Sequence, residues 1–380
     1  MNEKKLILNA CIITTDKVLP DYCLEIINGK ISSIFPSTQL QELEKDVEVF
    51  DACGAYVAPG MIDTHIHGVS GFGPELATED SLLDMSLQLA QQGVSAFCPT
   101  LYCGKPDSMF HIVSNTVGAF GKEKGAHIVG YHLEGPFISP QKPGVMKPQD
   151  IAPIDLQALD RLYQAAKGHV ANMTIAPELP NIDELAAFCR QRHILLQAGH
   201  TNATYEQFLD GVKLGITHVT HLFNAMSPFN HRAPGVAGAV LMHPEISAEI
   251  IADGVHVHPK IVSFLRDIKP IENIILVTDA LLPTAQKQGP FLANKEEVMF
   301  DGGVWKRKED KVIAGSALTM MQGVKNLLSF GYTLPQAIAC ASTNPARLLG
   351  LSTKGKIQEG MDADLIVFDK EFNIVKTFLA

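Results

Sequence analysis

Short apolar runs alternate with amphipathic segments of roughly 10 to 15 residues between about residues 58 and 350. Helical periodicity is clear in several of the amphipathic segments, for example 80–92, 107–120 and 181–192. The apolar runs predict strands at 56–62, 94–98, 128–133, 171–176, 194–198, 217–220, 247–252 and 273–278. Repeated β-then-α units imply a parallel sheet, and about eight of them predict an α/β fold of the (β/α)8 TIM-like barrel type.

Both ends of the chain depart from this pattern. Residues 5–57 alternate as short strands, with Asn28-Gly29 as a hairpin turn between two apolar runs, and residues 355–380 return to strand character. Neither end is large enough to fold alone. We therefore predict one small β-sandwich domain built from both chain termini, with residues 1–57 and 351–380 in it and residues 58–350 in the barrel.

Composition narrows the class of protein. Hydrophobic residues make up 46% and charged residues 19%, so a large core is expected, and the net charge of −10 gives no support to nucleic-acid or anionic-membrane binding. The seven cysteines form no CxxC pair, which favours a reducing compartment. With no signal-peptide pattern and no apolar run of about 20 residues, we expect a cytoplasmic protein that does not enter a membrane.

Polar side chains stand where the predicted strands end. In a parallel barrel the active site lies at the carboxyl ends of the strands, so these side chains are expected to meet. Their types are those of a metal site, and they are His65, His67, Glu134, His200, His221 and Asp279. A single histidine at a strand end is more often structural, and His65 and His67 alone would be only half a site. Their recurrence on five strands favours a metal site.

Imidazole and carboxylate ligands suit zinc, iron or manganese, and we expect one or two such divalent ions. A bound ion of this kind lowers the pKa of its water to about 7, which makes hydroxide available at neutral pH. Asp279 is the candidate that takes the proton during attack and returns it to the leaving group. The sequence also allows it to be a further metal ligand.

Several motifs resemble the N-acetylglucosamine-6-phosphate deacetylase family of the amidohydrolase superfamily over nearly the whole chain. The most specific are His132 to Pro136 (HLEGP) and His221 to Met226 (HLFNAM). The resemblance implies that Glu134, His200 and His221 are the main metal ligands. It also implies that His65 and His67 serve a second metal position that only some members have, and that Asp279 is the catalytic acid/base.

The same resemblance implies a substrate pocket. Its expected lining is Val145, Met146, Asn224, Ala225, His256, Ile313, Ala314 and Gly315. Arg232 matches a residue that reaches the phosphate bound in the neighbouring subunit, which implies a homodimer. On the residues alone, the stretch around Arg232 is more readily interpreted as a solvated loop.

Position 146 departs from the family pattern. Members usually carry a histidine there that polarises the substrate carbonyl, whereas methionine cannot donate a hydrogen bond. Either a second metal at His65 and His67 acts as the Lewis acid instead, or the substrate differs. We favour the first explanation.

The expected activity is metal-dependent removal of the N-acetyl group from an amino-sugar 6-phosphate, most simply N-acetylglucosamine 6-phosphate. An amidohydrolase acting on another N-acyl sugar phosphate or on a cyclic amide is the alternative. Relatives acting on cyclic amides bridge their metals with a modified lysine, and no strand-end lysine competes with Glu134 here. A catalytically silent barrel scaffold is the third possibility, and the complete ligand set argues against it.

Overall fold

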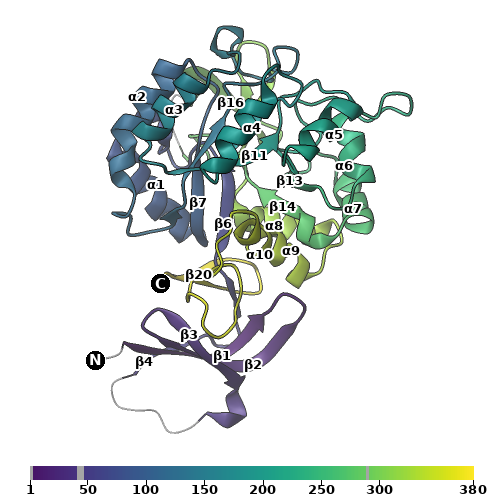
Figure 1. Ribbon diagram of the computed structural model, residues 1–380. Helices are drawn as coiled ribbons and strands as arrows, with labels where there is room; N and C mark the ends of the chain where they lie inside the picture. The colour runs from purple at the N-terminus through teal and green to yellow at the C-terminus, as the bar shows by residue number, and fades with distance from the viewer. Residues whose placement is uncertain (1–2, 41–46, 288–290) are drawn as a thin grey trace.

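Eight parallel strands follow one another around a barrel in the computed structural model, which describes residues 3–40, 47–287 and 291–380 (Figure 1). The barrel strands are β6 (Met61–Ile66), β7 (Val94–Leu101), β9 (Tyr131–Glu134), β10 (Val170–Ile175), β11 (Leu195–Ala198), β12 (His218–Val219), β13 (Ser247–Ile251) and β14 (Ile274–Val277). A short strand, β8 (His127–Ile128), pairs with β7. All residues of β6 and β7 are buried, as expected for parallel strands covered on both faces.

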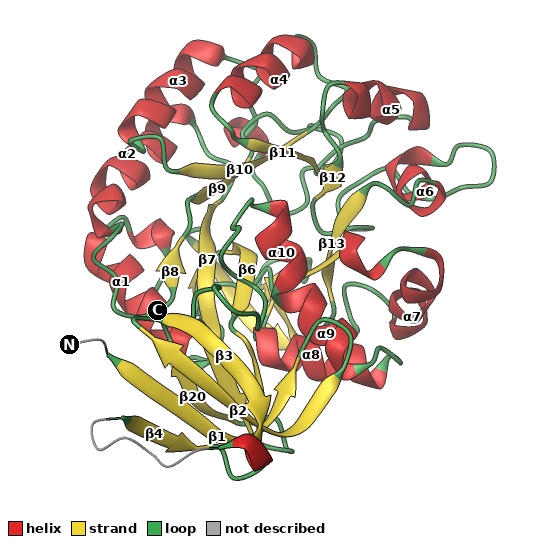
Figure 2. Ribbon diagram, turned by 60° about the horizontal axis from the view of Figure 1, so that its bottom comes forward, coloured by secondary structure: helices red, strands yellow, loops and turns green. Residues whose placement is uncertain are grey.

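Helices surround the strands (Figure 2). They are α1 (Glu79–Gln91), α2 (Pro106–Thr116), α3 (Leu156–Ala165), α4 (Ile182–Gln191), α5 (Tyr205–Lys213), α6 (Gly235–Met242), α7 (Pro259–Ile268), α8 (Met320–Ser329), α9 (Leu334–Ala341) and α10 (Thr343–Leu348). Side-chain caps begin several of them, including Thr78 at α1 and a capping box of Thr204 and Gln207 at α5. None of the described helices has the length and apolar character needed to cross a bilayer.

The barrel is nearly closed between its first and last strands. The Thr278 hydroxyl donates to Asp63 on β6 at 2.6 Å, and the amide of Asp279 donates to the carbonyl of His65 at 2.9 Å. These bonds join the end of β14 to the end of β6. They also set the position of Asp279 relative to His65.

Both ends of the chain build a second sheet. Its strands are β1 (Lys4–Ile13), β2 (Val18–Ile27), β3 (Lys30–Pro36), β4 (Glu48–Asp51), β5 (Tyr56–Pro59), β19 (Leu365–Phe368) and β20 (Ile374–Phe378). They form one seven-stranded sheet in which β1 pairs with β4 along its first half and with β5 along its second half. Asn28 and Gly29 both have positive φ, 51° and 74°, as a tight hairpin turn requires.

The predicted fold class, a TIM-like barrel with a small β domain from both termini, is therefore confirmed. The domain boundaries at 57/58 and 350/351 stay predictions. The predicted strand 56–62 is wrong as one element. The chain leaves the small sheet at Gly60, where an added Cβ would lie 2.3 Å from the Ser95 hydroxyl, and β6 then begins in the barrel.

A further small sheet was not predicted. It contains β15 (Leu292–Ala293), β16 (Glu296–Asp301), β17 (Val304–Arg307) and β18 (Ile313–Ser316), between β14 and α8. The amide of Ser316 donates to the carbonyl of Asp279 at 2.9 Å, and Leu281 donates to the carbonyl of Ser316 at 3.2 Å. This pairing brings β18 to the mouth of the barrel.

The terminal sheet has its own core, and Leu365 in β19 is fully buried in it. We expect Leu365→Ala to lower the free energy of unfolding by about 2–5 kcal/mol, because it removes buried methyl groups and leaves a cavity. Val375→Ala on the adjacent β20 is the control, since Val375 is 55% exposed and should cost under about 0.5 kcal/mol. Urea unfolding followed by circular dichroism measures both. Equal losses in the two variants would contradict this packing.

Candidate active site

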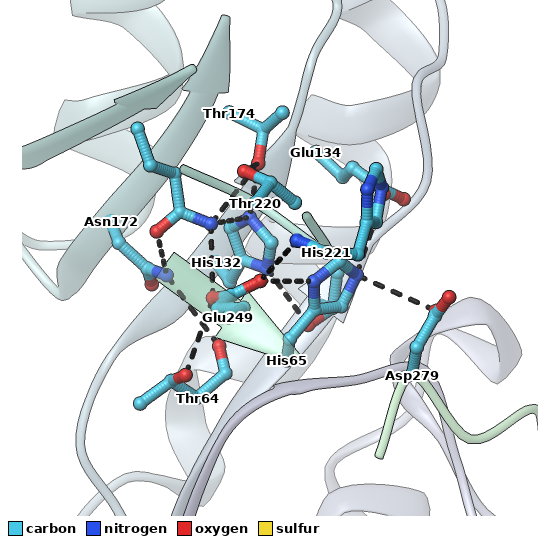
Figure 3. A network of polar contacts seen from close by, with 12 residues as sticks. Thr64, His65, His132, Glu134, Asn172, Thr174, Thr220, His221, Glu249 and Asp279 are labelled. Carbon is cyan, nitrogen blue, oxygen red and sulfur yellow. Dashed lines mark hydrogen bonds and ion pairs between the residues drawn. The ribbon is translucent and has the colours of Figure 1, made fainter. Parts of the chain in front are cut away.

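The six predicted side chains converge at the carboxyl ends of the barrel strands. Figure 3 shows four of them, His65, Glu134, His221 and Asp279. His65 lies in β6 and Glu134 ends β9, while His200, His221 and Asp279 each follow a strand by two residues. Those last three have positive φ values of 47°, 28° and 50°. Non-glycine residues adopt this conformation at an energetic cost, and such residues gather at functional sites.

The carboxylate of Glu134 lies at the centre of the cluster. Its Oε1 is 3.2 Å from Nε2 of both His200 and His221 and 3.4 Å from Nε2 of His65. Its Oε2 is 3.3 Å from Nε2 of His67. The donor atoms form two groups in which all lie within 4.8 Å of one another, Glu134–His200–His221 and His65–His67–Asp279. Glu134 therefore contacts both groups.

The second group is completed by Asp279. Its Oδ1 lies 3.5 Å from Nε2 of His65 and 3.4 Å from Nε2 of His67. Asp279 thus belongs to the second group and also lines the cavity at the mouth of the barrel. This position suits either of the two roles that the sequence left open for it.

The hydrogen bonds of the Nδ1 atoms show which rings face Glu134 with a lone pair on Nε2. Nδ1 of His200 is 3.0 Å from the carbonyl of Lys142 and Nδ1 of His65 is 3.0 Å from the carboxylate of Glu249. Both partners accept hydrogen bonds, so Nδ1 carries the proton and Nε2 of the neutral ring is a lone pair.

Lone pairs facing a carboxylate repel it unless a positive charge lies between them. The buried Nε2 of His65 and Oε2 of Glu134 indeed lack a hydrogen-bond partner among the described residues. Neutral imidazole nitrogens and carboxylate oxygens are the donors that zinc and similar divalent ions take. The residues therefore fit a metal ion in both groups.

The pKa values show the same need for positive charge. Burial alone would lower the pKa of His65, but the charges of Glu134, Asp279 and Glu249 outweigh it and hold that pKa well above its ordinary value. Without a bound ion the positive charge is supplied by protons on the rings: burial would raise the pKa of Glu134, but a protonated His65 and hydrogen bonds from His200 and His221 hold it well below its ordinary value. Glu134 is thus ionised near neutral pH, and its surroundings favour a cation.

A cavity of about 200 Å³ opens above the cluster. Its lining includes most of the predicted site residues, namely His67, Glu134, Val145, Met146, His200, His221, Asn224, Ala225, His256, Asp279, Ile313, Ala314 and Gly315. His65 is fully buried beneath this lining. Arg232 lies outside it, exposed on the loop that precedes α6. The roles of these residues stay predictions.

Met146 contributes an apolar wall to this cavity. It is 5% exposed and packs with Cys103 and Ile138, against Tyr102 and Ile151. Gly144 beside it has a φ of 58°, and an added Cβ would lie 3.1 Å from the ring of His200. The position where the resemblance led us to expect a histidine is thus apolar in this chain.

Two site residues were missed by the sequence reasoning. Tyr102 stacks on the His67 ring with centroids 3.7 Å apart and planes 4° apart, and Glu249 accepts from His65. A charged residue within the apolar strand 247–251 was a signal that could have found Glu249. No comparable signal marked Tyr102.

Comparison with known proteins gives consistent matches. The amidohydrolase family profile matches residues 56–380. The N-acetylglucosamine-6-phosphate deacetylase of Bacillus subtilis (strain 168) is 32% identical over 99% of this chain and 96% of its own length. The N-acetylgalactosamine-6-phosphate deacetylase of Escherichia coli O157:H7 is 30% identical over 97% of this chain and 96% of its own. A crystal structure of N-acetylglucosamine-6-phosphate deacetylase from Pasteurella multocida superposes with a TM-score of 0.91, at 28% identity over 99% of this chain and 98% of that one.

We expect Glu134→Gln to weaken retention of divalent metal by roughly tenfold or more, since loss of an outer partner of a ligand already costs about 10–100-fold. The measurement is metal content by mass spectrometry after dialysis against a weak chelator. Glu123→Gln is the matched control, because Glu123 contacts His127 and the amide of Ile128 instead. Full metal retention by Glu134→Gln would rule out the metal centre described here.

Proposed function

Because the chain belongs to the N-acetylglucosamine-6-phosphate deacetylases of the amidohydrolase family, we propose that it hydrolyses the N-acetyl group of an amino-sugar 6-phosphate to acetate and the free amine. The family resemblance predicted from the motifs is confirmed, and the chain is a hydrolase. The observation that carries the proposal is the buried Glu134, shared by both donor groups, with Asp279 beside it.

Glu134, His200 and His221 would hold one ion, and His65, His67 and Asp279 a second. When bound, a divalent ion supplies Lewis-acid chemistry and a coordinated water with a pKa near 7. The family and the ligand types support use of a divalent metal. Zinc, iron and manganese all suit these nitrogen and oxygen donors, so the proposal extends to any of the three.

Asp279 has the protonation state that a general base needs. Burial would raise its pKa, but positive charge at His65 and His67, carried by protons when no ion is bound, outweighs it, so the pKa lies below its ordinary value and the group is ionised. We propose that its carboxylate takes a proton from the attacking water as the carbon–oxygen bond forms. It then returns that proton to the sugar nitrogen as the carbon–nitrogen bond breaks.

His256 and the loops around it would bind the sugar. Burial would lower the pKa of His256, but its hydrogen bond to Asp253, 2.5 Å long, outweighs it and raises that pKa. A protonated His256 in the cavity lining offers a donor and a positive charge to the substrate. Asn224, Ala225, Ile313, Ala314 and Gly315 form the remaining walls, and we propose that they contact the sugar.

No lysine or arginine is among the described residues that line the cavity. A phosphate dianion is best held by such groups, arginine above all. Figure 2 shows the loop beside α6 projecting from the barrel. We propose a homodimer in which Arg232, exposed on the loop before α6, reaches the site of the neighbouring copy. Exposed Phe229 and the exposed Ile261, Phe264 and Ile268 on α7 give this side an apolar surface that suits a second copy.

The galactosamine epimer is a second candidate substrate, because one similar relative is named for it. A cyclic amide is less favoured, since no lysine is among the described residues that line the cavity. A silent scaffold is disfavoured by the completeness of those groups. The seven free cysteines suit a reducing compartment, and we propose a cytoplasmic location.

We expect acetate release from N-acetylglucosamine 6-phosphate, and much less from N-acetylglucosamine, in a panel of N-acetylated amino sugars with and without a 6-phosphate. Arg232→Ala should raise KM for the phosphorylated substrate by roughly tenfold or more, because bonds to charged groups contribute about 1.5–3 kcal/mol. Lys213→Ala is the control, since that lysine pairs with Asp210 on the surface. Release from unphosphorylated sugars alone would contradict the phosphate assignment. No release from any member would contradict the activity.

The rate should fall as pH decreases through the pKa of Asp279, because the base must be ionised. His67→Asn removes a proposed ligand of the ion beside Asp279 and so weakens the positive charge there. The carboxylate then becomes easier to protonate, which should move the acid limb of kcat/KM to higher pH in the residual activity. His193→Asn, at an exposed position, is the control and should leave the limb unmoved. A shift to lower pH, or none, would contradict the role of Asp279.

A further inference from the structure

A second carboxylate, Glu249, lies beneath the ligand cluster in the interior of the barrel. It is fully buried on β13, and Figure 3 shows it on the opposite side of His65 from Asp279. Its Oε2 is 3.0 Å from Nδ1 of His65 and accepts from the amide of His221 at 3.2 Å. Glu249 therefore contacts one ligand of each donor group.

The other oxygen of Glu249 is also occupied. Its Oε1 accepts from the Thr64 hydroxyl at 3.3 Å and from Nε2 of Gln197 at 3.2 Å, and Nε2 of His218 lies 3.7 Å away. The hydrogen-bonding partners are all donors to it. Donors on both sides require two acceptor atoms. A carboxylate has two acceptor oxygens, whereas an amide has one oxygen and one NH2 donor.

We propose that Glu249 is a positioning residue that holds the metal position formed by His65, His67 and Asp279. The hydrogen bond from Nδ1 of His65 fixes the ring plane and leaves Nε2 free as the ligand atom. This inference rests on the proposed metal use. It goes beyond it by naming a residue outside both donor groups that determines whether the second position is occupied.

Each position has one ring held by a hydrogen bond from outside the donor groups, and the two bonds have different partners. His200 in the first group donates to the carbonyl of Lys142, independently of Glu249. In the second group Nδ1 of His67 has no hydrogen-bond partner in the described part of the chain, and its ring is held by stacking on Tyr102. Among the described residues, Glu249 thus makes the only hydrogen bond from outside the donor groups to a ligand ring of the second group. Its loss should therefore affect the second ion more than the first.

His221 shows why the effect should be selective. Glu249 accepts from its backbone amide, not from its ring, and this amide belongs to the chain that follows β12. The ring itself faces Glu134 and His200. Removal of Glu249 leaves those ring contacts in place.

The test is a titration of chelator-stripped protein with Co²⁺, whose visible absorption reports each ligand environment. The wild type should take up a second equivalent. Glu249→Leu, which removes every acceptor, should weaken that second step by about 10–100-fold and leave the first within a few-fold. Glu249→Gln keeps one oxygen for His65, so it should weaken the second step measurably but less.

Asn344→Leu is the matched control for simple destabilisation. Asn344 is buried and donates to the carbonyls of Ile271 and Ile274 at the start of β14, away from every ligand. It should lower thermal stability without changing either binding step. If Glu249→Leu does not fold, Glu249→Gln decides the question.

An unchanged second step in Glu249→Gln or Glu249→Leu would overturn the proposal, as would equal weakening of both steps. A wild type that takes up only one equivalent would also overturn it. Acetate release by the wild type is measured in parallel. Acetate release by a wild type that binds only one equivalent would overturn this inference and leave the proposed activity intact. Two binding steps, of which the Glu249 variants weaken only the second, together with no acetate release, would support this inference and contradict the proposed activity.

Discussion

A buried carboxylate needs compensating charge, and the site depends on how this chain supplies it. Glu134 is 2% exposed at the end of β9, where solvation by water cannot offset the cost of burying its charge. Three strands and the residues after them bring imidazoles to 3.2–3.4 Å from its oxygens. At least two of those rings direct lone pairs toward it, so the cluster is complete only with a cation.

The barrel offsets the free-energy cost of burying these polar groups and keeps them rigid. Its apolar strands and helices bury a large core, which offsets the cost of the polar interior. Within that interior the polar groups form a connected network, with Glu134 above the histidines and Glu249 beneath them. Once a cation satisfies the unpaired ligand atoms, a network of this kind holds its side chains in one geometry, which a metal site requires.

Much of the fold and most of the site followed from one rule, that parallel strands end at the same mouth of a barrel. His200, His221 and Asp279 were found because they follow apolar runs, which remain visible in a single sequence. The change of sheet at Gly60 was hidden, because the apolar run continues through it. The β15–β18 sheet was missed because its short, half-exposed strands carry little periodicity.

Glu249 required the structure for a different reason. It lies inside a strand, and whether its side chain faces the barrel interior depends on register, which pairing between strands decides. For Arg232 the structure of one chain is not enough, because the resemblance assigned it a role that needs a second copy of the chain.

The central claim is that a cation joins the residues around Glu134. Anomalous X-ray diffraction from crystals of the protein loaded with Zn²⁺, measured on both sides of the zinc edge, locates such an ion directly. The account predicts a peak within about 2.0–2.2 Å of Glu134, His200 and His221. Zinc-loaded crystals with no peak there, and with Glu134 hydrogen-bonded to protonated histidines instead, would contradict it.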